Sequence, residues 1–264
     1  MSKLLVRWTF GEWAKKRTSP QAFSMLRTSI EFAKLIFPEA DFLLCCNRLY
    51  WSKAEIEDLV VTTGVPLFDA LPYLPDAFLT VPEKKNYFWK FVPPRLNPDG
   101  FELILDNDVI LWRRPVALEN WLKEGGLLAA SDSAKFYGDY ANEVNEADPD
   151  LYFNSGILGW PPGFIPSLDG VKPGEFGITE PGFEQGFAAL LFAQYSGSKR
   201  QVPLQDVPLA YTIKTRQNPQ ASQSLLKNAC GAHFCQCTYG FGNDWSKHYQ
   251  APIEAHLAEY KVHS

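Results

Sequence analysis

The first half of the chain alternates short apolar runs with segments that have the periodicity of helices. The first three apolar runs cover residues 4–6, 41–47 and 65–68. Helix-start signals stand between them: Ser19 and Pro20 are an N-cap residue and a first-turn proline, and Ser52 and Glu55 form a capping box. This β-α-β-α-β order predicts an α/β fold with a mainly parallel central sheet flanked by helices.

The composition fits one soluble domain of ordinary size. The chain has 264 residues, of which 46% are apolar, so it can bury a sizeable core. Its formal net charge of −5, without a block of Lys or Arg, argues against nucleic acid as a partner. No apolar run approaches the roughly 20 residues of a membrane helix, and Arg7 interrupts the first apolar run. We therefore expect a cytoplasmic protein without an integral membrane segment.

The five cysteines do not suggest a disulfide framework. Their number is odd, and Cys45 and Cys46 are adjacent in an apolar run, which favours reduced thiols in a core. Cys230, Cys235 and Cys237 surround a histidine, but their spacing is tighter than that of known zinc sites. We therefore expect no structural zinc.

An apolar strand near the middle of the chain ends in two carboxylates. The run at 101–105 leads directly into Asp106, Asn107 and Asp108. Because side chains alternate in an extended chain, Asp106 and Asp108 can face the same way. A divalent cation relieves their repulsion, and hard oxygen ligands suit Mg²⁺ or Mn²⁺, which in turn bind diphosphates. The pair predicts a metal site for a nucleotide diphosphate, although two aspartates can also begin a solvated turn.

The elements predicted after these aspartates continue the α/β pattern. They are a helix at 116–123, a strand at 126–131, a strand with a polar interruption at 151–160, and a helix at 183–194. Ligands of open parallel sheets lie beyond the carboxyl ends of the strands, where Asp106, Asp108 and Asp132 are expected. The Pro/Gly-rich loop at 159–182 is long enough for a lid or binding loop. A further helical segment is expected at 84–96.

Four segments, taken in order, resemble one family. They are Leu103-Ile-Leu-Asp-Asn-Asp-Val109, Phe153-Asn-Ser-Gly-Ile157, Glu184-Gln185 and Ala232-His-Phe234. Together they resemble the GT-A-fold glycosyltransferases, most closely the retaining family 8 type that includes glycogenin and bacterial lipopolysaccharide galactosyltransferases. The resemblance covers about residues 84–248. It implies a single GT-A domain, with a nucleotide-binding half at 1–132 and a half at 133–264 that binds the sugar and the acceptor.

The resemblance also implies an activity. Asp106, Asp108 and His233 would ligate Mn²⁺ or Mg²⁺, which would bind the donor diphosphate and act as a Lewis acid for the departing nucleotide. Glu184 and Gln185 would face the anomeric carbon and stabilise an oxocarbenium-like transition state. The implied reaction transfers a hexose from a nucleotide diphosphate sugar, with UDP as the expected nucleotide. The acceptor would be a hydroxyl of a glycan or another molecule, and the configuration would be retained.

Further positions would contact the donor. They are Thr9, Phe10, Lys90, Asn107, Asp132, Asn154, Ser155, Gly156 and Lys247. Asn154 and Gly156 would line the sugar subsite, with Asn154 and Asp132 offering hydrogen bonds to hydroxyls. Lys90 and Lys247 would meet the phosphates, and Thr9 and Phe10 would replace the acidic-aromatic base-binding segment that this chain lacks.

Simpler interpretations compete at several of these positions. Glu184 and Gln185 can be ordinary residues of a helix start, where a carboxylate is stabilised by the helix dipole. His233 lies in an apolar context that suits a core histidine, and Gly156 can mark a bulge. Lys90 and Lys247 can simply be solvated.

Two other classes of protein remain open from the sequence. Haloacid-dehalogenase-type phosphatases also place D-x-D after an apolar strand, and Asp106 would then be the nucleophile. However, Ile110 stands where that class has Thr or Val. A noncatalytic sugar-binding protein is the other alternative, because the chain has eight tryptophans that can stack on sugars or fill a core.

Overall fold

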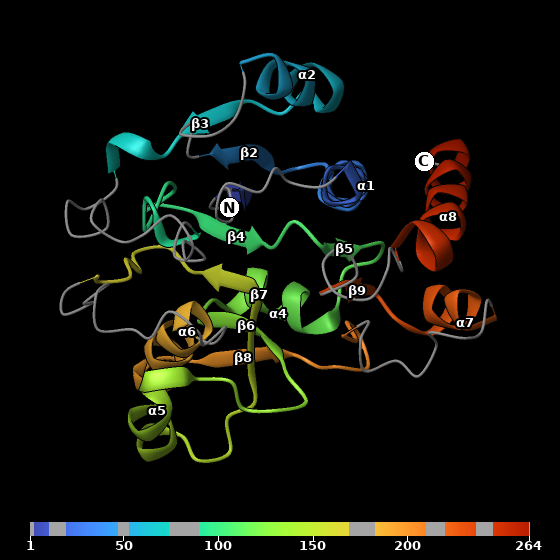
Figure 1. Ribbon diagram of the computed structural model, residues 1–264. Helices are drawn as coiled ribbons and strands as arrows, with labels where there is room; N and C mark the ends of the chain where they lie inside the picture. The colour runs from blue at the N-terminus through green and yellow to red at the C-terminus, as the bar shows by residue number, and fades with distance from the viewer. Residues whose placement is uncertain are drawn as a thin grey trace.

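A seven-stranded sheet forms the centre of the computed structural model, which describes residues 3–10, 20–46, 53–73, 90–168, 183–209, 220–235 and 245–263. The strand order is β3-β2-β1-β4-β7-β6-β8 (Figure 1). The strands are β1 (Leu4–Phe10), β2 (Asp41–Cys46), β3 (Leu67–Asp69), β4 (Phe101–Leu105), β6 (Leu127–Ser131), β7 (Phe153–Trp160) and β8 (Lys199–Val202). Only β7 runs antiparallel to its neighbours, so the predicted mainly parallel sheet is confirmed.

A second, two-stranded sheet lies beside the first. It pairs β5 (Val109–Leu111) with β9 (Gly231–His233) in antiparallel register, with Val109 opposite His233. Because β5 follows β4 after only three residues, this small sheet brings the late histidine to the carboxyl end of β4.

Helices cover both faces of the large sheet and surround the small one (Figure 1). They are α1 (Pro20–Ile36), α2 (Lys53–Thr63), α4 (Val116–Glu124), α5 (Ala141–Ala147), α6 (Phe183–Gln194), α7 (Gln220–Asn228) and α8 (Gln250–His263). Side chains of α1 and α4 share one buried cluster with β1 and β4, whereas α6 shares another with β7. Residues of α7 and α8 pack with those of β5 and β9 in a third.

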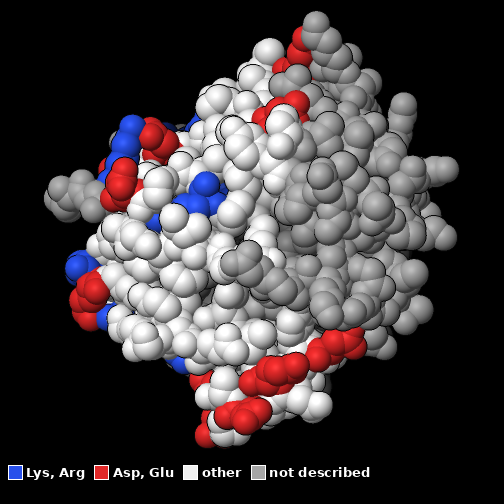
Figure 2. Space-filling model, turned by 90° about the vertical axis from the view of Figure 1, so that its left-hand side faces the viewer, with Lys and Arg blue, Asp and Glu red and all other residues white. Residues whose placement is uncertain are grey.

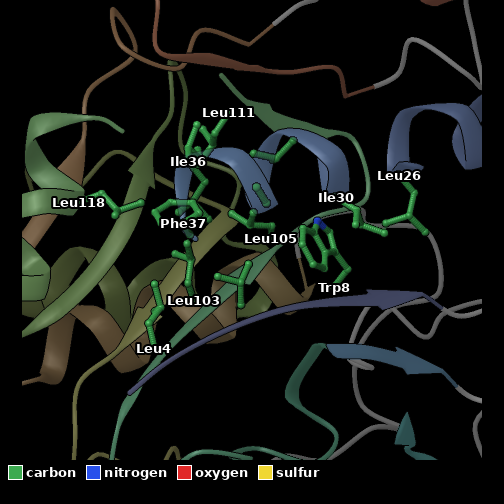
Figure 3. Packing of buried hydrophobic residues seen from close by; sticks show 14 of the residues in the cluster. Leu4, Trp8, Leu26, Ile30, Ile36, Phe37, Leu103, Leu105, Leu111 and Leu118 are labelled. Atoms are coloured by element: carbon green, nitrogen blue, oxygen red, sulfur yellow. The ribbon is translucent and has the colours of Figure 1, made fainter. Parts of the chain in front are cut away.

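The cluster under α1 fixes the strands that lead to the carboxylates. Trp8 on β1, Phe37 directly after α1, and Leu105 on β4 are buried there and lie close together (Figure 3). The indole of Trp8 donates to the Ser29 hydroxyl at 3.0 Å, and that hydroxyl donates to the Val109 carbonyl at 2.6 Å. The start of β5 is thereby tied to α1 and β1.

A fully buried ion pair joins β1 to β4. Arg7 Nε lies 2.8 Å from Glu102 Oε1, and neither side chain is exposed. The other oxygen of Glu102 accepts the N–H groups of Leu96 and Asn97 at 2.9 and 2.8 Å. Arg7 also donates to the Lys90 carbonyl at 3.0 Å. One charge pair thus anchors the segment at 90–97 to the sheet.

Most predicted elements are confirmed, with shifts at their ends. Of the expected helix at 84–96, residues 84–89 lie outside the described residues, and the chain from Lys90 forms a short 3-10 turn followed by bends. The expected strand with a polar interruption at 151–160 is confirmed: β7 is one buried strand, but its pairing with β6 shifts register between Ala129, opposite Leu158, and Ala130, opposite Asn154. Part of the predicted loop at 159–182 also lies outside the described residues.

Two expectations from composition can also be compared with the structure. Cys45, Cys46, Cys230 and Cys235 are not in disulfide bonds, and Cys237 lies outside the described residues. Within the described parts of the chain, no helix has the length and apolar character needed to cross a membrane.

Candidate active site

Two carboxylates and an imidazole meet where β4 ends and the small sheet begins. Asp106 follows β4, Asp108 precedes β5, and His233 ends β9. His233 Nε2 lies 3.2 Å from Asp108 Oδ1 and 4.0 Å from Asp106 Oδ2. The Phe234 N–H donates to the Asp108 carbonyl at 2.7 Å, which locks the two segments together. The predicted ligand set is therefore assembled.

The chemistry of this group fits a divalent cation. One ligand atom from each of the three side chains can lie within 4.8 Å of the others. Carboxylate oxygens suit Mg²⁺ and Mn²⁺, and an imidazole nitrogen is accepted more readily by Mn²⁺. Asn107 Oδ1, between the two aspartates in sequence, is buried without a hydrogen-bond partner in the described structure. An unsatisfied acceptor beside the cluster also fits a site that takes up a polar group.

Lys90 bridges the cluster to a second carboxylate. Its ammonium lies 2.7 Å from Asp106 Oδ1 and 2.6 Å from Glu184 Oε1. It also donates to the carbonyl and hydroxyl of Ser155 at 3.1 and 3.2 Å, and the Ser155 hydroxyl donates to Glu184 at 2.5 Å. Lys90, Glu184 and Ser155 are all buried. Lys90 is thus neither solvated nor on the surface.

Burial and neighbouring charges shift the proton equilibria of the site. Burial acts to lower the pKa of Lys90, but the charges of Asp106 and Glu184 outweigh it and raise that pKa. Burial raises the pKa of Asp106, against the attraction of Lys90. For Asp108 and His233, burial is outweighed by their mutual attraction, which lowers the pKa of Asp108 and raises that of His233.

The predicted sugar-binding residues lie next to the same cluster. Asn154 on β7 donates to Asp132 Oδ2 at 2.9 Å, and its Oδ1 lies 3.1 Å from His233 Nδ1. The Gly156 carbonyl accepts the Asp106 N–H at 2.9 Å. All of these contacts lie at the carboxyl ends of β4 and β6, the edge predicted for the ligand.

Gln185 points away from Glu184. Consecutive residues of a helix are about 100° apart, and α6 starts with Glu184 directed into the Lys90 pair. Gln185 is half-buried and makes a long contact of 3.4 Å to the Phe136 carbonyl. The two residues therefore occupy different sides of the helix start.

Three other predicted contacts are less closely connected. Thr9 and Phe10 end β1, the neighbour of β4, and the Thr9 hydroxyl is buried without a hydrogen-bond partner in the described structure. Lys247 is exposed on the short π-helix Trp245–Tyr249. No hydrogen bond or ion pair joins it to the other site residues in the described part of the chain.

The sequence reasoning missed the residues that anchor Lys90. Arg7 holds the Lys90 backbone, and Glu102 holds Arg7. The sequence does contain a signal, because Arg7 and Glu102 each stand as a charged residue within an apolar strand. Recognising them as a pair requires knowing that β1 lies beside β4, in a register that places Leu5 opposite Glu102.

Comparison with known proteins gives the fold a name. No family model and no curated protein matches the sequence. Among solved structures, the chain is similar to the galactosyltransferase LgtC in complex with donor and acceptor sugar analogs. The TM-score is 0.52 at 14% identity, covering 98% of this chain and 95% of that one. It is also similar to the bifunctional glycosyltransferase WbbM, with a TM-score of 0.56 at 14% identity, covering 97% of this chain and 50% of that one.

These similarities define the GT-A fold of nucleotide-diphospho-sugar transferases. The predicted resemblance to GT-A-fold glycosyltransferases is confirmed at the level of the fold, as is the predicted fold class. At such low identity the function must be argued from the site itself.

Proposed function

We propose that this protein is a metal-dependent glycosyltransferase that moves a hexose from a nucleotide diphosphate sugar to a hydroxyl acceptor with retention of configuration. The observation that carries the proposal is the cluster of Asp106, Asp108 and His233 at the carboxyl edge of a GT-A sheet. In this proposal the chain is one domain, with residues 1–132 binding the nucleotide and 133–264 binding the sugar and acceptor.

The metal would be Mn²⁺ or Mg²⁺, held by Asp106, Asp108 and His233. When bound, it supplies a Lewis acid that binds the donor diphosphate and offsets the charge of the departing nucleotide. The imidazole ligand favours Mn²⁺ slightly. Asn107, with its unpaired amide oxygen, would contact the donor in the same region.

Lys90 and Glu184 would act on opposite sides of the bond that breaks, the one between the sugar and the diphosphate. The Lys90 ammonium, 2.7 Å from Asp106, supplies positive charge where the phosphates would lie. The Glu184 carboxylate, held by Lys90 and Ser155, supplies negative charge for an oxocarbenium-like transition state. Gln185 lies on the other side of the helix start, next to the Phe136 carbonyl, and would contact the sugar from that side.

Other residues would complete the donor and acceptor subsites. Asn154, Gly156 and Asp132 would line the sugar subsite, and UDP would place its base near Thr9 and Phe10. Lys247 would contact a phosphate. The acceptor would be a glycan or another compound with a hydroxyl group. On the face in Figure 2, acidic side chains gather at the lower end and the Lys and Arg side chains that are drawn form no continuous patch.

The two alternative classes have less support. The solved structures named above are glycosyltransferases, so the fold comparison gives no support to a phosphatase with Asp106 as nucleophile. Trapping of an aspartyl phosphate at Asp106 would support that class instead. Glycan binding without any hydrolysis of a sugar donor would support a noncatalytic sugar-binding protein.

A calorimetric titration with UDP tests the proposal. We expect saturable binding with Mn²⁺ present, and loss of binding when a chelator replaces the metal. Asp108→Ala should weaken metal-dependent binding at least tenfold, because the site loses one of its three ligands. Asp150→Ala, at an exposed position, is the matched control. Intact binding and transfer by Asp108→Ala would show that the site is assigned incorrectly, and the anomeric configuration of the product, read by NMR, tests retention.

A further inference from the structure

An unbroken chain of polar contacts runs from Asp132 through Asn154 and His233 to Asp108. The contact distances are 2.9 Å from Asn154 Nδ2 to Asp132, 3.1 Å from Asn154 Oδ1 to His233 Nδ1, and 3.2 Å from His233 Nε2 to Asp108. Asp132, Asn154 and His233 are each less than 10% exposed. The three inner side chains are therefore held in one arrangement, largely shielded from water.

The hydrogen bonds determine which way the Asn154 amide faces. Asp132 Oδ1 accepts the N–H groups of Ser133 and Ala134 at 2.6 and 3.2 Å, which leaves Oδ2 for Asn154. An ionised carboxylate only accepts, so the atom of Asn154 that faces it must be the NH₂ group. The opposite atom, Oδ1, also accepts the Gly156 N–H at 2.8 Å. Contacts at both ends of the amide thus require the same orientation.

This orientation determines the protonation of one ring nitrogen of His233. An amide oxygen can only accept, so the Nδ1 atom that faces Asn154 Oδ1 must carry a proton. The other nitrogen, Nε2, faces the two aspartates. A neutral imidazole with its proton on Nδ1 has its free electron pair on Nε2, which is the form required of a metal ligand at that atom.

Gly156 allows the imidazole to lie directly against β7. A Cβ atom at position 156 would be 2.6 Å from His233 Cε1, 2.7 Å from His233 Nδ1 and 2.9 Å from Asn154 Oδ1. These distances are shorter than side-chain contacts allow, so any larger residue would displace the ring or the amide. The Asn-Ser-Gly segment therefore has a physical role toward the histidine as well as toward a sugar.

We propose that Asn154, oriented by Asp132, is a positioning residue for His233 that selects the Nδ1–H form and aims Nε2 at the metal site. The proposal rests on the proposed metal-dependent function and adds to it. Asn154 and Asp132 would affect the metal centre before any sugar is bound. A role limited to sugar hydroxyls would leave metal affinity unchanged in the absence of the donor.

Direct measurement of Mn²⁺ affinity without nucleotide separates these two roles. We expect Asn154→Ala to bind Mn²⁺ about 10–100-fold more weakly than the unmodified protein, the usual cost of losing a partner of a metal-bound histidine. Asn228→Ala is the matched control, because Asn228 is on α7 and bonds only to Ser224 among the side chains described. Equal Mn²⁺ affinity of Asn154→Ala and the unmodified protein would overturn the proposal.

Asp132→Asn provides a second variant that preserves the size of the side chain. The N–H groups of Ser133 and Ala134 still require an acceptor, so the new NH₂ group would face the NH₂ group of Asn154. This conflict should turn or displace the Asn154 amide and weaken Mn²⁺ binding, although Asp132 does not touch His233. If Asn154→Ala does not fold, unchanged affinity in Asp132→Asn would overturn the proposal.

The ¹⁵N NMR spectrum of the histidine rings supplies a readout that requires no metal. With four histidines in the chain, a His233→Gln variant assigns the signal of interest. We expect Nδ1 to carry a proton in the unmodified protein, and to carry it less completely in Asn154→Ala. If the protein binds no Mn²⁺, the proposed metal-dependent function fails, and the ring signals still decide about positioning. An unprotonated Nδ1 in the unmodified protein would overturn the proposal.

Discussion

Two clusters of buried charge share the segment at Lys90, but they differ in how they are closed. Arg7 and Glu102 are wholly buried, and Glu102 also accepts two backbone N–H groups. The second cluster consists of Lys90, Asp106 and Glu184. Its Asp106 side chain is 28% exposed, and that of the neighbouring Asp108 is 27% exposed. The first cluster is enclosed by the protein, whereas the second reaches the surface.

This difference separates structural charge from charge that can act on a ligand. A carboxylate already paired with an arginine and two backbone N–H groups, such as Glu102, has little capacity to bind another group. In the second cluster one ammonium serves two carboxylates, and Asp108 has only the His233 imidazole as a side-chain partner in the described structure. Such an incompletely neutralised group of carboxylates is suited to take up a cation.

The largest expected effect is on the enclosed pair. Arg7→Met leaves Glu102 as a buried charge with its main partner removed, so we expect a loss of about 3–5 kcal/mol in the free energy of unfolding. Urea denaturation with and without Mn²⁺ measures it. Because both side chains are fully buried, away from the Asp106–Asp108–His233 group, Mn²⁺ should not restore the loss. A loss below about 1 kcal/mol would show that the pair is not the enclosed structural element described above.

How much of the fold and of the candidate site could be predicted from the sequence depends on whether a residue acts within its own segment or across the sheet. The strands, most helices and the Asp106–Asp108 pair could be predicted, because periodicity and the D-x-D spacing are local signals, whereas His233 was expected only from the resemblance to GT-A-fold glycosyltransferases. The Arg7–Glu102 pair could not, because it depends on the register between β1 and β4.

The direction of Glu184 was equally hidden from the sequence. A helix-start carboxylate can point outward or inward, and the packing of α6 decides which. Gly186 lies so close to Tyr137 that a Cβ atom there would be 2.0 Å from the Tyr137 carbonyl oxygen. That close approach fixes the rotation of α6, with Glu184 facing Lys90 and Gln185 facing the Phe136 backbone.

We expect an intermediate effect when the second cluster loses the ammonium group of Lys90. Lys90→Met leaves Asp106 and Glu184 without their shared ammonium, but Asp106 is partly exposed and Glu184 keeps the Ser155 hydroxyl. We expect a loss of about 2–3 kcal/mol without metal, below that of a fully enclosed pair. Mn²⁺ should recover part of it by placing positive charge beside Asp106, a result read from the same urea curves.

That recovery would distinguish the two clusters directly. Recovery by Mn²⁺ in Lys90→Met but not in Arg7→Met would confirm that only the second cluster admits a cation. Equal responses of the two variants to Mn²⁺ would contradict the distinction. Adding Asp108→Ala to Lys90→Met should abolish the recovery, because it removes a proposed metal ligand while leaving the enclosed pair intact.

The smallest effect is expected from an ion pair outside both clusters. Arg27 and Asp58 lie 2.5 Å apart between α1 and α2, with side chains 44% and 61% exposed. Water solvates both charges in the folded and unfolded states, so Arg27→Met should change the free energy of unfolding by less than about 1 kcal/mol, with or without Mn²⁺. Raising the salt concentration should reduce even this difference, since exposed pairs are screened. Because Arg7→Met and Arg27→Met make the same chemical change, their difference isolates the effect of enclosure from that of losing an arginine. A loss from Arg27→Met as large as that from Arg7→Met would mean that burial does not explain the strength of the inner pair.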